Sequence, residues 1–316
     1  MNLSLFDSPP QFDKEALAKR LRVLADGRIF VGTSSWKYDG WLDQIYTRER
    51  YLSRGKFSQK AFEAECLKEF AETFPIVCGD FSFYQFPTAE FWKKLFDGAP
   101  PQLKFALKVP EEVTAEVFPR HPRYGPRAGR TNETYLKADV FRAMFLEPLE
   151  PYRSRIACLI FEFGARSATA EEFVAQIVPF FAALPDTFRY AVEVRNREYL
   201  VATYFEALKE HRTAHVLNAW TKMPPLGEQI AIPGAFTADF TVVRALLRAG
   251  RAYEAAVEQF APYNKIQDEN PEGRNALRAV IARMRQEQRA AYIFVNNRFE
   301  GNSPETIRAV VDEASD

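Results

Sequence analysis

Eight short apolar segments recur along this chain of 316 residues, and nearly all are followed by a segment with the periodicity of an amphipathic helix. Strict alternation of strand and helix predicts parallel strands joined by right-handed crossovers. Eight such units in a chain of this length match a closed (β/α)8 TIM barrel, which is an α/β fold. We predict strands at 29–35, 76–84, 104–109, 156–163, 189–194, 215–220, 240–246 and 291–295. We predict helices at 13–24, 59–73, 88–96, 133–146, 169–184, 200–211, 275–288 and 304–313.

The order of these segments also predicts how the chain is organised. Residues 1–28 form an N-terminal arm and helix, and residues 29–316 form one barrel domain with a long insertion, 110–132, after the third strand. A doubly wound open sheet is the alternative, and it usually carries a glycine-rich phosphate loop after its first strand. The loop from Gly32 to Trp36 reads Gly-Thr-Ser-Ser-Trp and has neither a G-x-G-x-x-G motif nor a P-loop. The barrel is therefore favoured.

Charge and cysteine content restrict the partners and the compartment. Lys plus Arg and Asp plus Glu number 42 each, so no global charge attracts nucleic acid or an anionic membrane. The three cysteines lie far apart in apolar surroundings, which predicts free thiols in a reducing compartment. The first residues lack the pattern of a secretory signal, and no apolar run reaches the roughly 18 residues of a membrane span. We expect a soluble cytoplasmic protein that makes no membrane contact and carries no cofactor.

Polar side chains gather toward the C-terminal ends of the predicted strands. Because side chains alternate along a strand, one parity of each strand points into the barrel, and sites in barrels lie at this end. Three acids and three bases have that parity, so the set is neutral as a whole: Asp80, Glu162, Glu193, Lys108, Arg195 and Arg244. The uncharged members are Ser34 or Ser35, Asn218, and Asn296 or Asn297. Such a ring predicts a site for a small polar or anionic ligand, including a phosphorylated compound.

Several kinds of chemistry remain open for this ring. Glu193 and Arg195 suit either a site or an ion pair that only closes the barrel. Lys108 suits a Schiff-base nucleophile or, more simply, a counter-charge for a carboxylate. Glu162 and Glu193 suit a retaining glycosidase only if their carboxyl groups lie about 5 Å apart. The three histidines form no ligand cluster and none ends a strand, so we expect no metal site and no Ser-His-Asp triad.

Motifs along most of the chain resemble those of the YecE-like family. They are Gly32-Thr-Ser-Ser-Trp36 with Tyr38 and Gly40-Trp41, Phe83-Tyr84-Gln-Phe-Pro87-Thr88, Phe105-Ala-Leu-Lys108-Val-Pro110, Ala191-Val-Glu193-Val-Arg195, Phe294-Val-Asn296-Asn297 and Glu300-Gly301-Asn302. The resemblance implies a TIM barrel and supplies no established reaction. It implies that the mouth residues are Trp36, Tyr84, Lys108, Glu193, Arg195 and Asn297. The chain departs from the family pattern in its second strand, where a glutamate and an asparagine are replaced by Cys78 and Asp80.

Two further segments suggest partners. The insertion carries Arg120, Arg123, Arg127 and Arg130 beside Tyr124, which suits phosphate or a nucleic-acid strand with a stacked base. The simpler interpretation is a solvated loop whose arginines pair with Glu111, Glu112 and Glu116. Residues Asn2-Leu-Ser-Leu-Phe6 resemble the peptides by which DNA-repair proteins dock on the replication sliding clamp, although they also suit a tail that packs on its own barrel.

Together these observations support three hypotheses. The first is a TIM-barrel enzyme that acts on a small polar or phosphorylated ligand, with Glu193 as an acid/base or orienting group. Asp80 and Glu162 are its other candidate carboxylates, Lys108 and Arg195 hold anions, and Trp36 and Tyr84 form the walls. The second is a nucleic-acid-associated barrel that uses the arginine-rich insertion. The third is a non-catalytic ligand sensor that lost a catalytic glutamate at Cys78.

Overall fold

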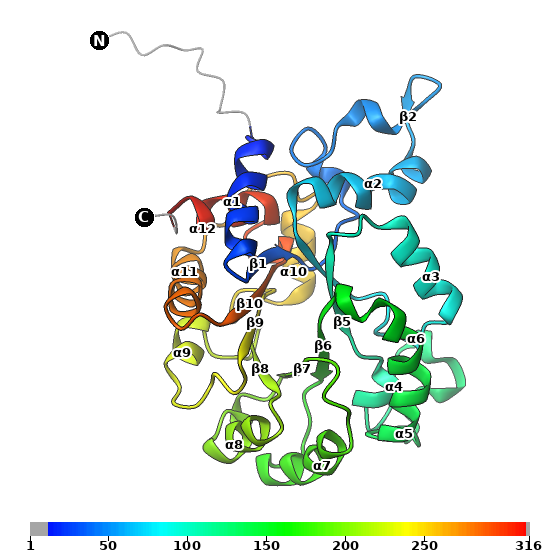
Figure 1. Cartoon of the computed structure of the whole chain (residues 1–316), viewed down its shortest axis with the longest axis vertical. Helices are drawn as coiled ribbons and strands as arrows, with labels where there is room; N and C mark the ends of the chain where they lie inside the picture. Colours follow the sequence, from blue (N-terminus) through cyan, green and yellow to red (C-terminus); the bar gives the residue numbers. More distant parts are fainter. Residues whose placement is uncertain (1–11, 314–316) are drawn as a thin grey trace.

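Eight parallel strands close into a barrel in the computed structural model, which describes residues 12–313 (Figure 1). The strands are β1 (Ile29–Thr33), β4 (Ile76–Gly79), β5 (Lys104–Lys108), β6 (Ile156–Phe163), β7 (Tyr190–Val194), β8 (Ala214–Ala219), β9 (Phe240–Ala245) and β10 (Ala290–Val295). They follow one another around the barrel in this order, and β10 pairs with β1 to close it. The predicted (β/α)8 fold is confirmed.

Helices surround this barrel. Those at predicted positions are α1 (Lys14–Asp26), α2 (Gln59–Thr73), α3 (Ala89–Gly98), α7 (Ala170–Ala182), α8 (Ala202–Glu210), α11 (Pro271–Gln286) and α12 (Ser303–Glu313). The sequence did not predict α4 (Glu111–Thr114), α9 (Leu226–Ala231) and α10 (Tyr253–Phe260), or a small antiparallel hairpin of β2 (Leu52–Ser53) and β3 (Lys56–Phe57). Single helical turns occur at Asp39–Trp41, Arg48–Tyr51, Pro122–Arg127, Glu150–Arg155, Arg197–Tyr199 and Asn297–Phe299.

Several helices begin at side chains that accept a hydrogen bond from the first turn. Asp13 accepts from the amide of Ala16 at 2.8 Å, and Thr88 accepts from the amide of Phe91 at 3.2 Å. Thr169 forms a capping box with Glu172 at the start of α7. These contacts satisfy amides that have no partner inside the helix, so the predicted helix starts follow from local chemistry.

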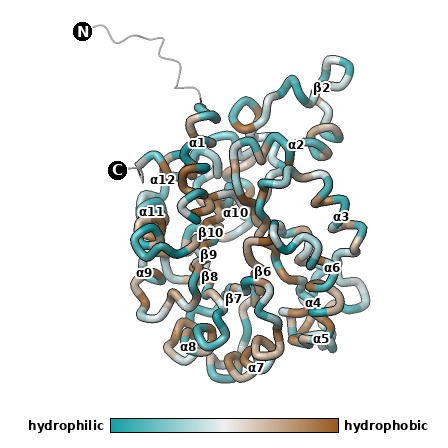
Figure 2. Tube along the Cα trace, viewed as in Figure 1, coloured by the Kyte–Doolittle hydropathy of each residue, from teal (hydrophilic) through white to brown (hydrophobic). Residues whose placement is uncertain are grey.

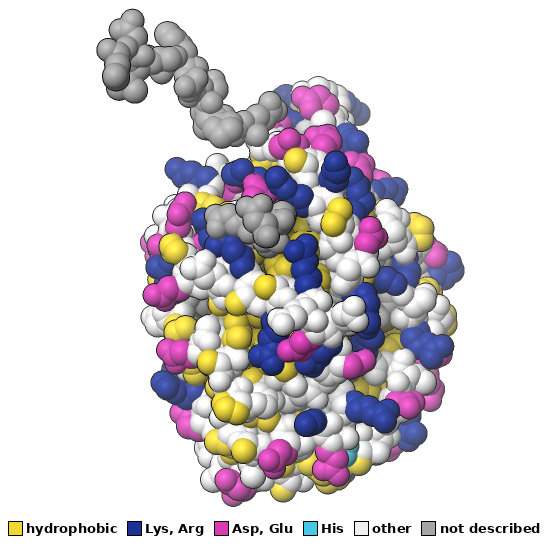
Figure 3. Space-filling view, turned by 60° about the vertical axis from the view of Figure 1, so that its left-hand side comes forward, with side chains coloured by type: hydrophobic (Ala, Val, Ile, Leu, Met, Phe, Trp, Pro, Cys, Tyr) yellow, Lys and Arg dark blue, Asp and Glu magenta, His cyan; other side chains and the backbone are white. Residues whose placement is uncertain are grey.

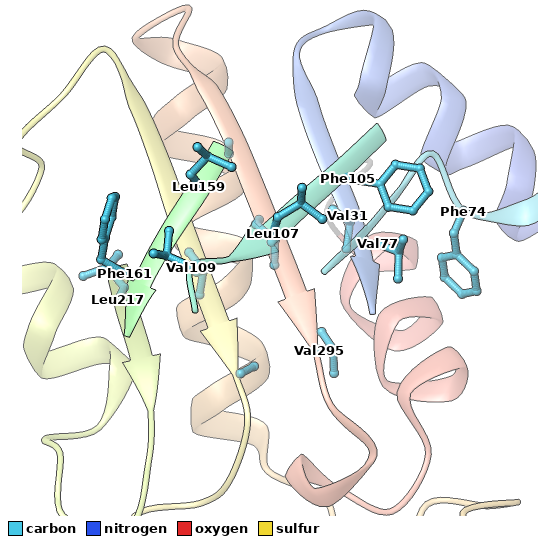
Figure 4. Packing of buried hydrophobic residues seen from close by; sticks show 14 of the residues in the cluster. Val31, Phe74, Val77, Phe105, Leu107, Val109, Leu159, Phe161, Leu217 and Val295 are labelled. Carbon is cyan, nitrogen blue, oxygen red and sulfur yellow. The ribbon is translucent and has the colours of Figure 1, made fainter. Parts of the chain in front are cut away.

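Two apolar layers hold the barrel together. Small and branched side chains such as Cys78, Ala106 and Ile160 fill its interior. Larger side chains of the other parity, including Leu107 and Phe161, lie outside the strands and pack against the helices (Figure 4). The hydropathy colours agree with this arrangement: brown, hydrophobic residues are frequent along the central strands, and the surrounding helices mix teal and brown residues (Figure 2). The predicted strand parity therefore agrees with the structure.

The second barrel strand is shorter than predicted. The prediction extended it to residue 84, but β4 ends at Gly79 and the chain turns, with the amide of Phe83 donating to the carbonyl of Asp80 at 3.1 Å. The ring of Phe81 folds back over Gly79, where an added Cβ would lie 2.2 Å from it. The hydroxyl of Ser82 donates to the carbonyl of Lys108 at 2.6 Å and fixes this turn against β5. Asp80 therefore follows the strand instead of lying within it.

The helix predicted at 133–146 is also misplaced. The helical stretch begins at residue 138 and consists of α5 (Ala138–Phe141), a π-helical turn (Arg142–Leu146) and α6 (Glu147–Leu149). Leu136 has a positive φ of 50°, which a helix interior does not accept, so the segment before it forms turns. The side chain of Asn132 fixes these turns through the carbonyls of Glu112 and Ala115, at 2.9 and 2.7 Å.

The peptide Asn2–Phe6, with its suggested sliding-clamp contact, lies outside the described residues. In the described part of the chain, no helix combines the length and the apolarity needed to cross a bilayer. Basic and acidic side chains are interspersed on the face shown in Figure 3.

Candidate functional site

The six charged residues predicted at the strand ends come together at the C-terminal mouth of the barrel. Their centre is Oε2 of Glu162, which lies 3.0 Å from Nζ of Lys108, 2.9 Å from Nη2 of Arg195 and 2.7 Å from Nη1 of Arg244. Glu193 contacts the same two arginines through its two oxygens, at 2.8 Å to Nη2 of Arg195 and by a shorter contact to Nη1 of Arg244. We call these residues, with Asp80, the charge network.

Asp80 is the most loosely held member of the charge network. Its Oδ1 lies 3.7 Å from both Lys108 Nζ and Arg244 Nη2, and about half of its side chain is exposed. Three acids are thus matched by three bases, as predicted. Buried charges are stable only when paired, because removal of one partner leaves the other without compensation in a medium of low polarity.

The charges in the centre of the network are fixed. Burial by itself raises the pKa of Glu162, but Arg195, Lys108 and Arg244 outweigh it and hold that pKa well below its usual value. Burial alone would lower the pKa of Arg244, but nearby acidic groups raise that pKa well above its usual value. Glu193 has the largest of these effects, and Glu162 also contributes. Glu162 is therefore an anion and Arg244 a cation at neutral pH.

Aromatic rings orient two of the cations. The guanidinium of Arg195 lies 4.1 Å from the ring centre of Trp220, and Nζ of Lys108 lies 3.4 Å from that of Phe83. Both arrangements are cation–π contacts. Lys108 contacts two carboxylates and an aromatic ring, as a charged ammonium group does. These contacts favour the interpretation of Lys108 as a counter-charge over its interpretation as a Schiff-base nucleophile.

A cavity of about 320 Å³ opens beside Asp80, and we call it the Asp80 cavity. The predicted residues Ser34, Trp36 and Asn296 line it, so the structure brings these side chains to the mouth. Its other lining residues are Ser35, Lys37, Tyr38, Cys78, Phe81, Tyr253 and Arg298. The hydroxyl of Ser34 is buried and has no hydrogen-bond partner among the described residues, which leaves it available to a ligand.

A second cavity of about 350 Å³ opens beside Glu162, and we call it the Glu162 cavity. Glu111 and Thr114 line it from α4, and Arg166 and Ser167 line it from the segment after β6. Asp80 lines the first cavity and Glu162 lines the second, and Lys108 contacts both acids. This lysine therefore connects the two cavities within the charge network.

Other predicted site residues have anchoring contacts. The side-chain oxygen of Asn297 accepts from Nε1 of Trp41 at 3.2 Å and from the amide of Ser303 at 2.8 Å, so it ties the loop after β1 to the start of α12. Asn218 is fully buried and donates to the carbonyl of Val194 at 3.1 Å. Neither residue lines the Asp80 cavity or the Glu162 cavity.

Two more predicted residues lie apart from both cavities. Tyr84 is 46% exposed and stacks under the guanidinium of Arg123, with 4.3 Å to its ring centre. Glu193 has no exposed surface, so its position suits orientation of the arginines better than proton transfer to a ligand. The charge network therefore meets the cavities through Asp80 and Glu162, while its remaining members hold these two acids in place.

Cys78 occupies the place of the glutamate in the family pattern. It lies inside the barrel and lines the floor of the Asp80 cavity. Burial raises the pKa of its thiol to about 12, so the group is neutral at physiological pH. A neutral thiol neither donates nor accepts protons as a carboxyl group does, and Cys78 does not replace that glutamate chemically.

The arginine-bearing part of the insertion is mostly exposed, although Phe118 and Tyr124 within it are buried. Arg127 pairs with Glu112 at 3.2 Å, as the solvated-loop interpretation predicts, whereas Glu116 contacts Arg166 instead. Arg120 and Arg130 make no ion pair with any residue in the described range 12–313.

Sequence reasoning missed several cavity residues, and two of them are charged residues that follow strand ends. Glu111 directly follows the Lys108-Val-Pro segment at the end of β5, and Arg298 directly follows the two asparagines at the end of β10. The signal in the sequence that could have identified them is a charged residue just after a strand, because the strand ends form the mouth of a barrel. Glu111 was considered only as a partner for loop arginines, and Arg298 was not considered.

The fold and the charge network define a TIM-barrel protein with a ligand-sized, charged C-terminal mouth. Residues 30–316 match the family described as Protein of unknown function DUF72, and the chain belongs to this family, which is the YecE-like family that its motifs resemble.

Solved structures of the same family have the same fold. A DUF72 family protein from Enterococcus faecalis is 18% identical, with 90% of this chain and 95% of that chain covered and a TM-score of 0.61. One from Thermotoga maritima is also 18% identical, with 91% and 99% covered and a TM-score of 0.60. No curated protein matches the sequence. At these identities the likeness to the solved structures shows the fold alone.

Proposed function

We propose that the mouth binds a small polar compound with an anionic group, such as a phosphate, and performs acid–base chemistry on it. The observation that carries this proposal is an excess of positive charge in the Asp80 cavity. The charge network is neutral as a set, and Lys37 and Arg298 add two cations to the cavity wall. Arg298 makes no ion pair with any described residue, so an anionic ligand would be its partner.

The remaining walls of the Asp80 cavity suit the rest of such a ligand. Trp36, Phe81 and Tyr253 supply aromatic surface, and Tyr253 also orients Arg298, whose guanidinium lies 4.4 Å from its ring centre. The hydroxyl of Ser34 supplies a hydrogen bond. Pockets with mostly apolar walls and a few convergent polar groups are typical of small-molecule sites.

The charge network would supply the reactive surroundings. Glu162 is held as an anion by three cations, and an anion fixed in this way stabilises positive charge that develops on a bound compound without reorganisation. Fixed charges of this kind support an enzyme more than a simple binding protein. The predicted cytoplasmic location belongs to this proposal, and the three buried free cysteines support it.

A thermal-shift screen of phosphorylated metabolites, sugars, nucleotides and inorganic phosphate tests the proposal. We expect a phosphorylated compound to raise the melting temperature of the wild type and to lose this effect in Arg298→Ala. The matched control is Arg283→Ala, because Arg283 also stacks on an aromatic ring, Phe236, but lies on α11. Retention of the effect in Arg298→Ala, or no effect of any compound on the wild type, would contradict the proposal.

Nucleic-acid binding is a second candidate, which the exposed insertion supports. Arg120 and Arg130 lack ion pairs within the described residues, and Arg123 stacks on an exposed tyrosine. Contacts of this kind neutralise phosphates, and the resulting affinity falls steeply with salt. Fluorescence anisotropy with single-stranded DNA and RNA at 50 and about 200 mM salt measures this. No binding at low salt would eliminate this candidate.

The ligand sensor is distinguished by turnover. A sensor is stabilised by a compound that it never converts, whereas an enzyme consumes it. Mass spectrometry of each stabilising compound after incubation with the protein therefore separates the two. The neutral thiol of Cys78 supports the sensor only if no other group at the mouth transfers protons.

A further inference from the structure

Glu111 is a carboxyl group at the mouth for which the charge network provides no partner. It begins α4, and its amide donates to the carbonyl of Phe83 at 2.7 Å, which fixes the backbone beside the turn after β4. Its Oε2 is buried and has no hydrogen-bond partner among residues 12–313. A buried polar atom without a partner is costly and needs an explanation, and a role in binding or catalysis is one of them.

Glu111 lines the wall of the Glu162 cavity together with Glu162. The other charged residues on this wall are Glu116 and Arg166, and they contact each other. Arg166 is further engaged by Tyr135 and Gln176. The cavity therefore carries no spare cation, and it suits a neutral, hydroxyl-bearing part of a ligand better than an anionic group.

Charges of both signs face Glu111 from the surrounding elements. Lys108 on β5 and Arg123 in the insertion are the cations, and Glu162 on β6 and Glu112 on α4 are the anions. None of the cations lies within ion-pair distance of the Glu111 carboxyl group in the described structure. Burial raises the pKa of Glu111 to about 7, and Lys108 offsets part of this effect.

Glu111 and Glu162, two of the carboxyl groups of this cavity, thus differ in protonation. Glu162 stays ionised because its three cations hold its pKa low, whereas Glu111 exchanges a proton near neutral pH. Two titratable groups whose surroundings separate their pKa values in this way are a common arrangement of an acid/base group beside a fixed anion. The best acid/base catalyst has a pKa close to the working pH.

We propose that Glu111 is the proton-transfer group of the mouth and that it acts on a hydroxyl or leaving-group oxygen bound between it and Glu162. This inference rests on the proposed function. It names the residue that transfers the proton and the part of the ligand that receives it. The Glu111 carboxyl group gives its proton to the ligand oxygen as the bond between that oxygen and the rest of the ligand breaks, and the oxygen keeps the electron pair of the bond. A water molecule adds to the other end of the broken bond and returns one proton to the Glu111 carboxylate, so one water is consumed in each cycle.

An infrared titration of the unliganded protein tests the protonation of Glu111 directly. A protonated carboxyl group has a carbonyl band that is distinct from that of a carboxylate. We expect the wild type to lose one such band with a midpoint near pH 7, and Glu111→Gln to lack this step. The matched control is Glu116→Gln, because Glu116 lines the same cavity but is half exposed. The same step in Glu111→Gln, or a wild-type midpoint below about pH 5, would overturn the inference.

The stability of the protein gives a second readout without a ligand. The folded pKa of Glu111 lies above its unfolded value of about 4.3. Below both values the group is protonated in both states, so it imposes no electrostatic cost. As the pH rises from about 4.3 to about 7, ionisation favours the unfolded state. The wild type should therefore lose stability relative to Glu111→Gln over this range and show a constant difference above it.

Compounds that raise the melting temperature in the screen test the transfer itself. Glu111→Gln should still be stabilised by such a compound but should convert it about 10²- to 10⁴-fold more slowly. Equal turnover by Glu111→Gln and the wild type would overturn the role of Glu111 and leave the ligand site intact. If no compound binds, the proposed function fails, and the infrared titration still decides whether Glu111 holds a proton at neutral pH.

Discussion

Two glutamates, the buried Glu69 on α2 and the largely buried Glu162 on β6, show how similar ion pairs serve different purposes. Each carboxylate is paired with a lysine, since Lys14 lies 3.1 Å from Glu69 and Lys108 lies 3.0 Å from Glu162. The remaining partners of Glu69 include the amide of Thr47 at 3.0 Å, its hydroxyl at 2.7 Å and the hydroxyl of Tyr51 at 2.7 Å. Glu69 therefore ties the loop after β1 to two helices.

The partners of Glu162 are of another kind. They are cations within or directly after three different strands, and a cavity opens beside the carboxylate. Buried atoms without partners accompany them, including Nη1 of Arg195 and Nε of Arg244. At Glu69, neutral donors satisfy the carboxylate oxygens, and this contact stabilises the fold. At Glu162, charged side chains converge beside a cavity, and some of their polar atoms have no hydrogen-bond partner in the described part of the chain, so these atoms can bind a ligand. The following predictions test this difference.

The largest effect is expected for Arg244→Met, which removes a buried cation from two carboxylates. Loss of one partner of a buried pair leaves an uncompensated charge, so the free energy of unfolding should fall by about 3–5 kcal/mol. Urea denaturation measures it. Glu193→Gln in the same chain should recover part of this loss, because the two residues are in contact. Strict additivity of the two changes would show that they do not act as one network.

A smaller loss is expected for Glu69→Gln. Hydrogen bonds to charged groups contribute about 1.5–3 kcal/mol, and the free energy of unfolding at pH 7 should fall by that amount. Burial alone raises the pKa of Glu69, but Thr47, Tyr51 and Lys14 outweigh it and lower that pKa. Its stabilisation is therefore present above the unfolded pKa of about 4.3 and is lost as the pH falls through the folded pKa. A difference between variant and wild type that persists in acid would contradict this assignment.

The smallest effect on stability is expected for Ser34→Ala. Its buried hydroxyl has no partner in the described structure, so its removal should change the free energy of unfolding by less than about 0.5 kcal/mol. The same change should weaken the stabilisation by a ligand. Thr47→Val is the comparison, because it removes a hydroxyl that donates to Glu69 and should cost stability without any effect on the ligand. The opposite outcome would reverse the roles of the two regions.

The sequence predicted the parts of the molecule that follow from periodicity. Alternation along the strands placed Glu162, Lys108 and Arg244 inside the barrel, and the C-terminal end followed from the fold. The early end of β4 was not predictable, because the turn depends on Phe81 packing over Gly79 and on Ser82 bonding across to β5.

Two properties of the site could not be predicted from the sequence: the protonation of Glu111 and the lack of an ion pair at Arg298 among the described residues. Glu111 looks like any acid at a helix start, and it is burial in the folded protein that raises its pKa to about 7. Arg298 lines the Asp80 cavity in contact with Tyr253, which comes from a helix that was not predicted. Both properties arise from contacts between elements that are distant in the chain.

The most direct test compares the two lysines. A compound that stabilises the wild type is measured with Lys108→Met and with Lys14→Met, two variants that each remove a lysine from a buried glutamate. We predict that the rise in melting temperature disappears in Lys108→Met, because Asp80 and Glu162 lose the lysine that they share, and that it persists in Lys14→Met. An equal rise in both variants would contradict the claim that the charge network forms the ligand site.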